Sequence, residues 1–98
     1  MATFHLSPLD DADLDEIWQF ISMDSDEMAD RFIAELLQKF ELLAAHPFAG
    51  VKSVELGADS RKFPHKSYLI FYFPTEYGAE IYRILHAAQD IQEIFTDQ

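Results

Sequence analysis

The clearest pattern in the chain lies in "ADRFIAELLQKFELLAAHPFAG", residues 29–50. Its apolar residues recur at intervals of three and four, which is the spacing of one face of an α-helix. They are Ala29, Phe32, Ile33, Leu36, Leu37, Phe40, Leu43 and Ala44. The helix is expected to stop at His46, because the residue before Pro47 is pushed out of the helical region. Such a long apolar stripe needs a sheet to cover it.

A second helix is predicted just before this stretch, in "SPLDDADLDEIWQFISMD", residues 7–24. Ser7 can cap it and Pro8 suits the first helical position. Its carboxylates are expected on the exposed face, since Leu14, Ile17, Trp18 and Ile21 form the apolar one. Only a short break follows, with Asp24 or Ser25 as the next cap, so the two helices should form an antiparallel hairpin.

The remaining segments predict a small sheet. Strands are expected at residues 2–7, 60–64, 67–73 and 80–87, and a last short helix at 88–95. "SYLIFYF", residues 67–73, suits a central strand buried on both faces. A short turn should pair it antiparallel with 80–87. The predicted fold is therefore α+β, in the order β-α-α-β-β-β-α. A helical hairpin packs on a small, mainly antiparallel curved sheet, in one domain over residues 1–98.

Between the long helix and this sheet lies "HPFAGVKSVELGADS", residues 46–60. A connection of this length without structure of its own is uncommon in a compact domain and is often functional. We expect it to be an irregular loop and a candidate functional segment.

The composition narrows the class of protein. There is no cysteine, which excludes disulfides and thiolate metal sites. The N-terminus lacks a basic region followed by an apolar run, so no secretory signal is visible. No apolar run approaches the length that spans a bilayer. We expect a cytoplasmic protein that does not contact a membrane.

The net charge of −11 is concentrated in residues 1–50, which hold eleven acidic and two basic side chains. Such a chain is repelled by nucleic acid unless its basic groups gather in one place, so direct nucleic-acid binding is not expected. Four of the seven basic residues lie between Lys52 and Lys66, and Arg83 can join them. Either phosphate contacts occur there, or this is an ordinary solvated loop.

Familiar catalytic and metal-binding motifs do not fit. The four histidines are not at metal-binding intervals, and the acidic start of the first helix lacks the spacing of an EF-hand. The serines lack a nucleophile elbow, and three glycines cannot build a phosphate loop. The sequence therefore predicts no catalytic residues, no metal and no cofactor.

Four strings carry a resemblance across nearly the whole chain: "SPLDDADLDEIWQFI", "ADRFIAELLQKFELLAAHPFAG", "SRKFPHKSYLIFYF" and "IYRILHAAQD". In this order and spacing they resemble the ParE branch of the RelE/ParE toxins. The resemblance implies the toxin of a type II toxin–antitoxin module, of the plasmid-stabilisation kind. A ParD-like antitoxin would wrap across it in a hetero-oligomer, with DNA gyrase as the target.

The other branch, the RelE-type toxins, cuts messenger RNA on the ribosome and is the alternative function. RNA cleavage needs a base, an acid and cations around the phosphate. Only Arg61, Lys62, Arg83 and His86 are available for those parts. Many ParE-like sequences read "HGARD" where this chain has "HAAQD", so Gln89 replaces an arginine. Many also read "FYR" where this chain has "FYF", so Phe73 replaces another positively charged residue. These departures argue against RNA cleavage and leave a third alternative, a non-toxic binding relative.

The resemblance also suggests which residues contact partners. The candidates for target binding are Arg61, Lys62, Tyr68, Arg83, His86 and Gln89. The candidates for antitoxin binding are Trp18, Phe71, Phe73 and Tyr82. Each has a structural alternative: His86 can cap a backbone group, Arg61 can form a surface ion pair, and the aromatic residues can belong to the core. Arg83 and His86 are expected on opposite faces of their strand.

Overall fold

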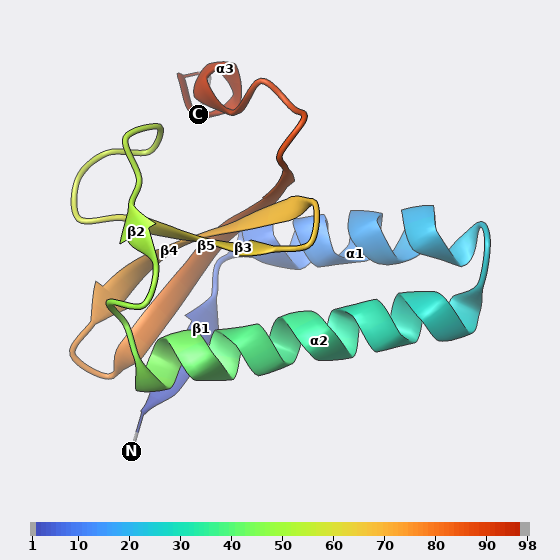
Figure 1. Cartoon of the computed structure of the whole chain (residues 1–98), viewed down its shortest axis with the longest axis horizontal. Helices are drawn as coiled ribbons and strands as arrows, with labels where there is room; N and C mark the ends of the chain where they lie inside the picture. The colour runs from blue at the N-terminus through green and yellow to red at the C-terminus, as the bar shows by residue number, and fades with distance from the viewer. Residues whose placement is uncertain (1, 97–98) are drawn as a thin grey trace.

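A computed structural model describes residues 2–96 (Figure 1). The predicted domain also included residues 1 and 97–98, which lie outside the described residues. The elements are β1 (Thr3–Leu6), α1 (Pro8–Ser22), α2 (Asp26–Ala45), β2 (Val51–Lys52), β3 (Arg61–His65), β4 (Tyr68–Thr75), β5 (Gly78–His86) and α3 (Ile91–Thr96). The predicted α+β fold is confirmed, with one strand, β2, that the sequence did not suggest.

The sheet has five strands in the order β1-β5-β4-β3-β2. β1 runs parallel to β5, and the other neighbours are antiparallel. β5 carries a β-bulge, because Phe71 pairs with Arg83 while Tyr72 pairs with Ile81. Tyr82 is thus the extra residue, and the strand bends there.

The two long helices form the predicted antiparallel hairpin on one side of the sheet (Figure 1). The hydroxyl oxygen of Ser7 caps α1 by accepting a hydrogen bond from the Asp10 N–H at 3.1 Å. Ser25, and not Asp24, caps α2, accepting from the Met28 N–H at 3.2 Å. α2 ends at Ala45 with His46 as its C-cap, as the following proline predicts.

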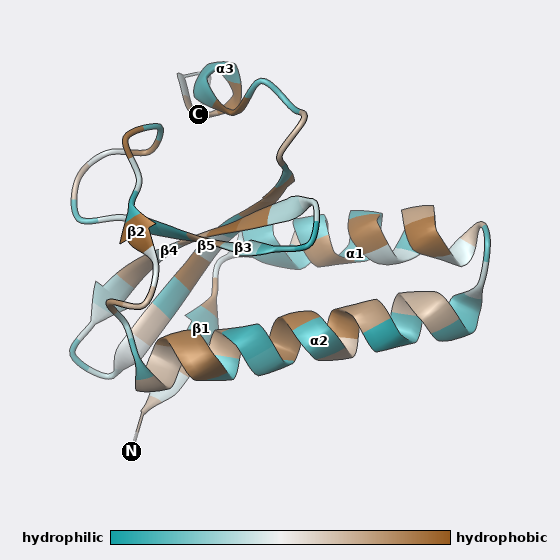
Figure 2. Cartoon of the chain, in the orientation of Figure 1, coloured by the Kyte–Doolittle hydropathy of each residue, from teal (hydrophilic) through white to brown (hydrophobic). Residues whose placement is uncertain are grey.

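The apolar stripe of α2 makes the main core. Leu36, Phe40 and Leu43 are fully buried against Ile70 and Tyr72 of β4. Burial of one such side chain contributes about 2 kcal/mol. Figure 2 shows the apolar residues as separate bands along α2. The prediction that Leu37 belongs to the covered stripe is wrong. This side chain is 38% exposed, because it lies at the outer edge of the hairpin beside Trp18.

A second, smaller core lies on the opposite face of the sheet. Phe71 and Leu85 are buried there against Ile91 of α3, and Phe95 packs edge-to-face on Phe71 with ring centroids 4.8 Å apart. The prediction that β4 is buried on both faces is therefore confirmed. α3 covers this face while the helical hairpin covers the other.

The connection 46–60 was predicted to be an irregular loop, and this prediction is wrong for two of its residues. Val51 and Lys52 form β2, which pairs with Lys62 and Arg61 of β3. The Tyr72 hydroxyl holds the start of this segment, donating to the Pro47 carbonyl at 2.7 Å and accepting from the Gly50 N–H at 2.9 Å. A core tyrosine thus fixes the loop from beneath.

Over residues 2–96, no helix is both long enough and apolar enough to cross a bilayer.

Candidate protein-binding site

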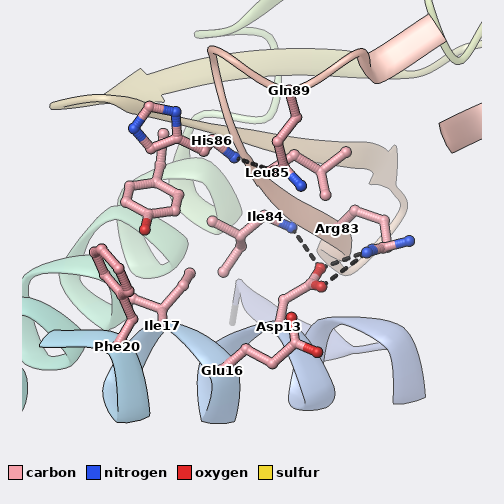
Figure 3. Close-up of a pocket in the computed structure, with 10 residues that line it drawn as sticks. Asp13, Glu16, Ile17, Phe20, Arg83, Ile84, Leu85, His86 and Gln89 are labelled. Atoms are coloured by element: carbon pink, nitrogen blue, oxygen red, sulfur yellow. Dashed lines mark hydrogen bonds and ion pairs between the residues drawn. The ribbon is translucent and has the colours of Figure 1, made fainter. Parts of the chain in front are cut away.

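A hollow of about 430 Å³ lies between α1 and the end of β5 (Figure 3). We call it the α1–β5 groove. α1 contributes Asp13, Glu16, Ile17 and Phe20, and β4 contributes Tyr68. β5 contributes its last four residues, Arg83 to His86, and Gln89 follows them. Four of the six predicted target-binding residues, Tyr68, Arg83, His86 and Gln89, therefore line one groove.

The floor of the groove is a bidentate ion pair. Arg83 donates from Nε to Asp13 Oδ2 at 2.7 Å and from Nη2 to Asp13 Oδ1 at 2.9 Å. The Ile84 N–H also donates to Asp13 Oδ2, at 2.9 Å. These hydrogen bonds raise the pKa of Arg83 above its usual value. Both side chains are largely buried, at 15% and 6% exposed, so the guanidinium of Arg83 is already engaged.

Asp13 takes this position because β1 is short. Its pairing with β5 ends at Leu6 and Ile81, so the rest of β5 has no neighbouring strand on that side. The Asp13 carboxylate accepts the backbone hydrogen bond that a longer β1 would have taken.

His86 and Gln89 shape the turn that leaves β5. The Ala88 N–H donates to His86 Nδ1 at 3.0 Å, and the His86 N–H donates to Gln89 Oε1 at 2.7 Å. The His86 ring packs edge-to-face on Tyr68, with centroids 5.1 Å apart. The structural alternative for His86, capping a backbone group, is what the geometry shows.

Arg83 and His86 line the same groove but do not meet. Figure 3 shows Arg83 turned toward Asp13 and His86 turned toward the other end, with Ile84 between them. The geometry does not combine the two into one catalytic cluster.

The other two target-binding candidates lie elsewhere. Arg61 donates from Nη1 to the Gly50 carbonyl at 2.7 Å and stacks over Phe48, 4.9 Å from the ring centroid. Lys62 points to the opposite face of β3 and pairs with Glu55 at 2.8 Å. The basic residues between 52 and 66 are therefore dispersed, and they do not join Arg83.

The four antitoxin candidates do not share one surface. Trp18 is half-buried at the outer side of the hairpin, donating from Nε1 to Asp30 Oδ1 at 2.8 Å. Phe73 and Tyr82 pack edge-to-face on the α3 side of the sheet, with centroids 5.9 Å apart. Phe71 is fully buried and has no exposed surface in this structure, so its contact with the antitoxin stays a prediction.

Asp10 is the residue that sequence reasoning missed. Its side chain is fully buried, and within residues 2–96 neither carboxylate oxygen has a hydrogen-bond partner. Burial, followed by the neighbouring Asp13 and Asp11, raises its pKa from 3.8 to about 8, although Arg83 acts in the opposite direction. The expectation that the first helix exposes all its carboxylates is wrong for Asp10 and Asp13. Their spacing to Ile17, seven and four residues, was the available signal.

Among residues 2–96, no three histidine, aspartate or glutamate side chains gather in a way that could hold a metal ion.

The fold is a small α+β domain with a groove between α1 and β5. Comparisons with known proteins agree on the family. Residues 4–91 match the family described as the ParE toxin of the type II toxin-antitoxin system, parDE. The chain therefore belongs to the ParE toxin family.

Two relatives show how far the similarity extends. The chain is 32% identical over 91 residues to Toxin ParE1 of Caulobacter vibrioides (strain ATCC 19089 / CIP 103742 / CB 15), covering 92% of this chain and 94% of that protein. A solved structure of the chromosomal ParDE TA system from P. aeruginosa superposes with a TM-score of 0.73 at 19% identity. It covers 88% of this chain and 96% of that one, and it supports the fold.

Proposed function

We propose that this ParE-family toxin inhibits DNA gyrase by binding it, and that a ParD-like antitoxin neutralises the toxin. The assignment to a toxin–antitoxin module comes from the family match and from the relative named Toxin ParE1. The gyrase target comes from the resemblance to the ParE branch.

The observation that favours action by binding over RNA cleavage is the Asp13–Arg83 ion pair. A ribonuclease of the RelE type needs free cations around the phosphate that it cleaves. Here the guanidinium of Arg83, which lines the groove with His86, donates two hydrogen bonds to Asp13 from its Nε–Nη2 edge. Lys62 and Lys66 are paired with Glu55 and Glu35, away from the groove. The RNA-cleaving alternative therefore lacks its electrostatic support.

The α1–β5 groove suits an antitoxin segment. Phe20 is 69% exposed, and Ile17 and Tyr68 line the groove beside it, which provides apolar contacts for an amphipathic helix. Asp13 is neutralised by Arg83, but Glu16 at the rim is exposed and has no ion-pair partner within the described residues. The groove therefore favours a segment with apolar anchors and basic flanks.

A supercoiling assay with purified gyrase tests the target. The protein should stabilise gyrase–DNA cleavage complexes, and messenger RNA should stay intact when the protein is expressed alone. Equimolar antitoxin should abolish the effect. Fragmented transcripts with unaffected supercoiling would instead favour the RelE-type alternative, and normal growth with unaffected gyrase would favour the non-toxic relative.

A matched pair of variants tests the groove. Phe20→Ala should weaken antitoxin binding by about tenfold, because a central aromatic anchor is lost. Met23→Ala removes another exposed apolar residue at the same end of α1, but one that does not line the groove, and should leave binding unchanged. Equal effects of the two variants would place the antitoxin elsewhere.

A further inference from the structure

A second exposed surface lies at the other end of the sheet. Phe48 is 72% exposed, and the guanidinium of Arg61, the cross-strand partner of Lys52, lies over its ring. We call these three residues the β2-edge patch. Figure 1 places β2 at the far side of the sheet from α1.

The patch is held rigidly from beneath. The Tyr72 hydroxyl bonds to both Pro47 and Gly50, and Arg61 bonds to the Gly50 carbonyl while stacking on the Phe48 ring. A Cβ at Gly50 would lie 2.6 Å from the Lys62 carbonyl oxygen, so the chain fits here only without a side chain. An aromatic side chain presented by a fixed backbone loses little entropy when it binds a partner.

The charge of the patch differs from that of the rest of the molecule. Lys62 and Lys66 are neutralised by Glu55 and Glu35. Within residues 2–96, neither Lys52 nor Arg61 forms an ion pair with a carboxylate. Both line a hollow of about 390 Å³ with Phe48, Pro74 and a single acidic residue, Asp59. Although the chain has a net charge of −11, the patch is locally positive and favours negatively charged ligands.

We propose that the β2-edge patch docks an acidic segment of the toxin's target protein, one that carries an apolar or aromatic side chain beside its carboxylates. The carboxylates would lie against Lys52 and Arg61, and the apolar side chain against Phe48. β2 is the last strand of the described sheet, so an extended segment can also pair with its outer edge. The inference rests on the proposed function, because it takes the toxin to act by binding a target protein.

The target, and not the antitoxin, is assigned to this patch because the two surfaces favour opposite charges. The α1–β5 groove exposes Glu16 and hides its arginine in an ion pair, so it favours basic segments. The β2-edge patch has two cations without carboxylate partners and favours acidic ones. Their positions at opposite ends of the sheet leave each free to bind its own partner.

The direct test is a titration of the isotope-labelled protein with a short peptide that has two phenylalanines flanked by glutamates. Amide shifts should cluster at residues 48–54 and 61. The double variant Phe48→Ser/Lys52→Glu should bind about tenfold more weakly. Both side chains are exposed, so the variant should keep the wild-type melting temperature. The matched control Met23→Ser/Arg31→Glu changes an exposed apolar residue and an exposed cation elsewhere, and should bind normally. Shifts elsewhere, or equal binding by both double variants, would overturn the inference.

The functional test compares the same proteins for growth arrest, gyrase inhibition and co-purification with antitoxin. Phe48→Ser/Lys52→Glu should inhibit gyrase about tenfold less while still binding antitoxin. Loss of antitoxin binding with inhibition retained would overturn the assignment to the target. If the wild-type protein neither arrests growth nor inhibits gyrase, the proposed function fails, and the peptide titration still decides whether the patch takes acidic segments.

Discussion

Asp13 and Arg83, 70 residues apart in the sequence, join α1 to β5 through two charged hydrogen bonds. The same carboxylate accepts the Ile84 N–H, so one side chain both neutralises the arginine and completes the edge of the sheet. The arginine that the family resemblance marks for target contact is thereby part of the framework. It fixes the helical hairpin against the strand that lines the groove.

Removing the Asp13 carboxylate should therefore destabilise the protein strongly. Asp13→Ala leaves the Arg83 guanidinium and the Ile84 N–H without their acceptor, and breaking a buried pair in this way costs about 3 kcal/mol. Urea unfolding measures the loss. Asp15→Ala, at an exposed position of the same helix, should change the free energy of unfolding by less than about 0.5 kcal/mol. A similarly small effect at Asp13 would show that the pair contributes little.

Asp10 should make the protein less stable as the pH rises. Its pKa is about 8 in the folded protein and near 3.8 when unfolded, so the folded state binds the proton more tightly. This stability is fully present below about pH 4 and is lost progressively up to about pH 8, by a total on the order of 5 kcal/mol. Asp10→Asn cannot ionise and should flatten the wild-type curve over this range.

The comparison of Asp10→Asn with Asp11→Asn isolates the effect from that of other carboxylates. Asp11 lies beside Asp10 in the sequence but is exposed. Between pH 4 and pH 9, the free energy of unfolding of Asp11→Asn should fall with pH as steeply as that of the wild type. That of Asp10→Asn should not. Identical slopes in all three proteins would mean that Asp10 is ionised at neutral pH in the folded state.

These two aspartates show what the sequence could and could not predict. The stripe of α2 apart from Leu37, the Ser7 cap and the proline stop depend on local spacing, so they were predicted correctly. The spacing of Asp10 to Ile17 places it on the apolar face of α1, but its full burial depends on how the start of that helix packs in the folded protein. Likewise, Lys62 and Arg61 are adjacent in sequence but lie on opposite faces of β3, so a basic cluster in the sequence did not become one in space.

Restoring an arginine at position 89 tests the alternative implied by the family resemblance, in which the α1–β5 groove contacts the target and has lost potency with the arginine. Gln89→Arg places a guanidinium at the rim of the α1–β5 groove, where Arg83 is already occupied. Under that alternative, Gln89→Arg should arrest growth at a lower level of expression, with transcripts intact. The variant also loses the hydrogen bond from the His86 N–H, at about 1 kcal/mol. Gln89→Ala controls for that loss, and equal toxicity of the two variants would leave the degenerate-site hypothesis without support.

The acidic rim of the α1–β5 groove should be matched by basic residues in the antitoxin. Like charges oppose association, so the antitoxin segment should carry more basic residues than such segments usually do. Glu16→Lys should weaken antitoxin binding by about fivefold, and more so at low salt, because the rim charge is reversed. Glu41→Lys, exposed on α2 away from the groove, is the control for net charge. A strongly acidic antitoxin tail, or tighter binding by Glu16→Lys, would contradict the charge argument.

Tyr72→Phe should loosen the β2-edge patch without emptying the core. The ring is fully buried among Phe40 and Ile70, and phenylalanine fills the same space. The lost hydroxyl leaves the Gly50 N–H and the Pro47 carbonyl without partners, which costs about 2 kcal/mol. Hydrogen exchange should therefore rise at Gly50 and across residues 47–54, while α2 keeps its protection. If the patch must be rigid to bind, this variant should also take up the acidic peptide more weakly. Faster exchange with unchanged peptide binding would show that the exposed side chains alone determine recognition.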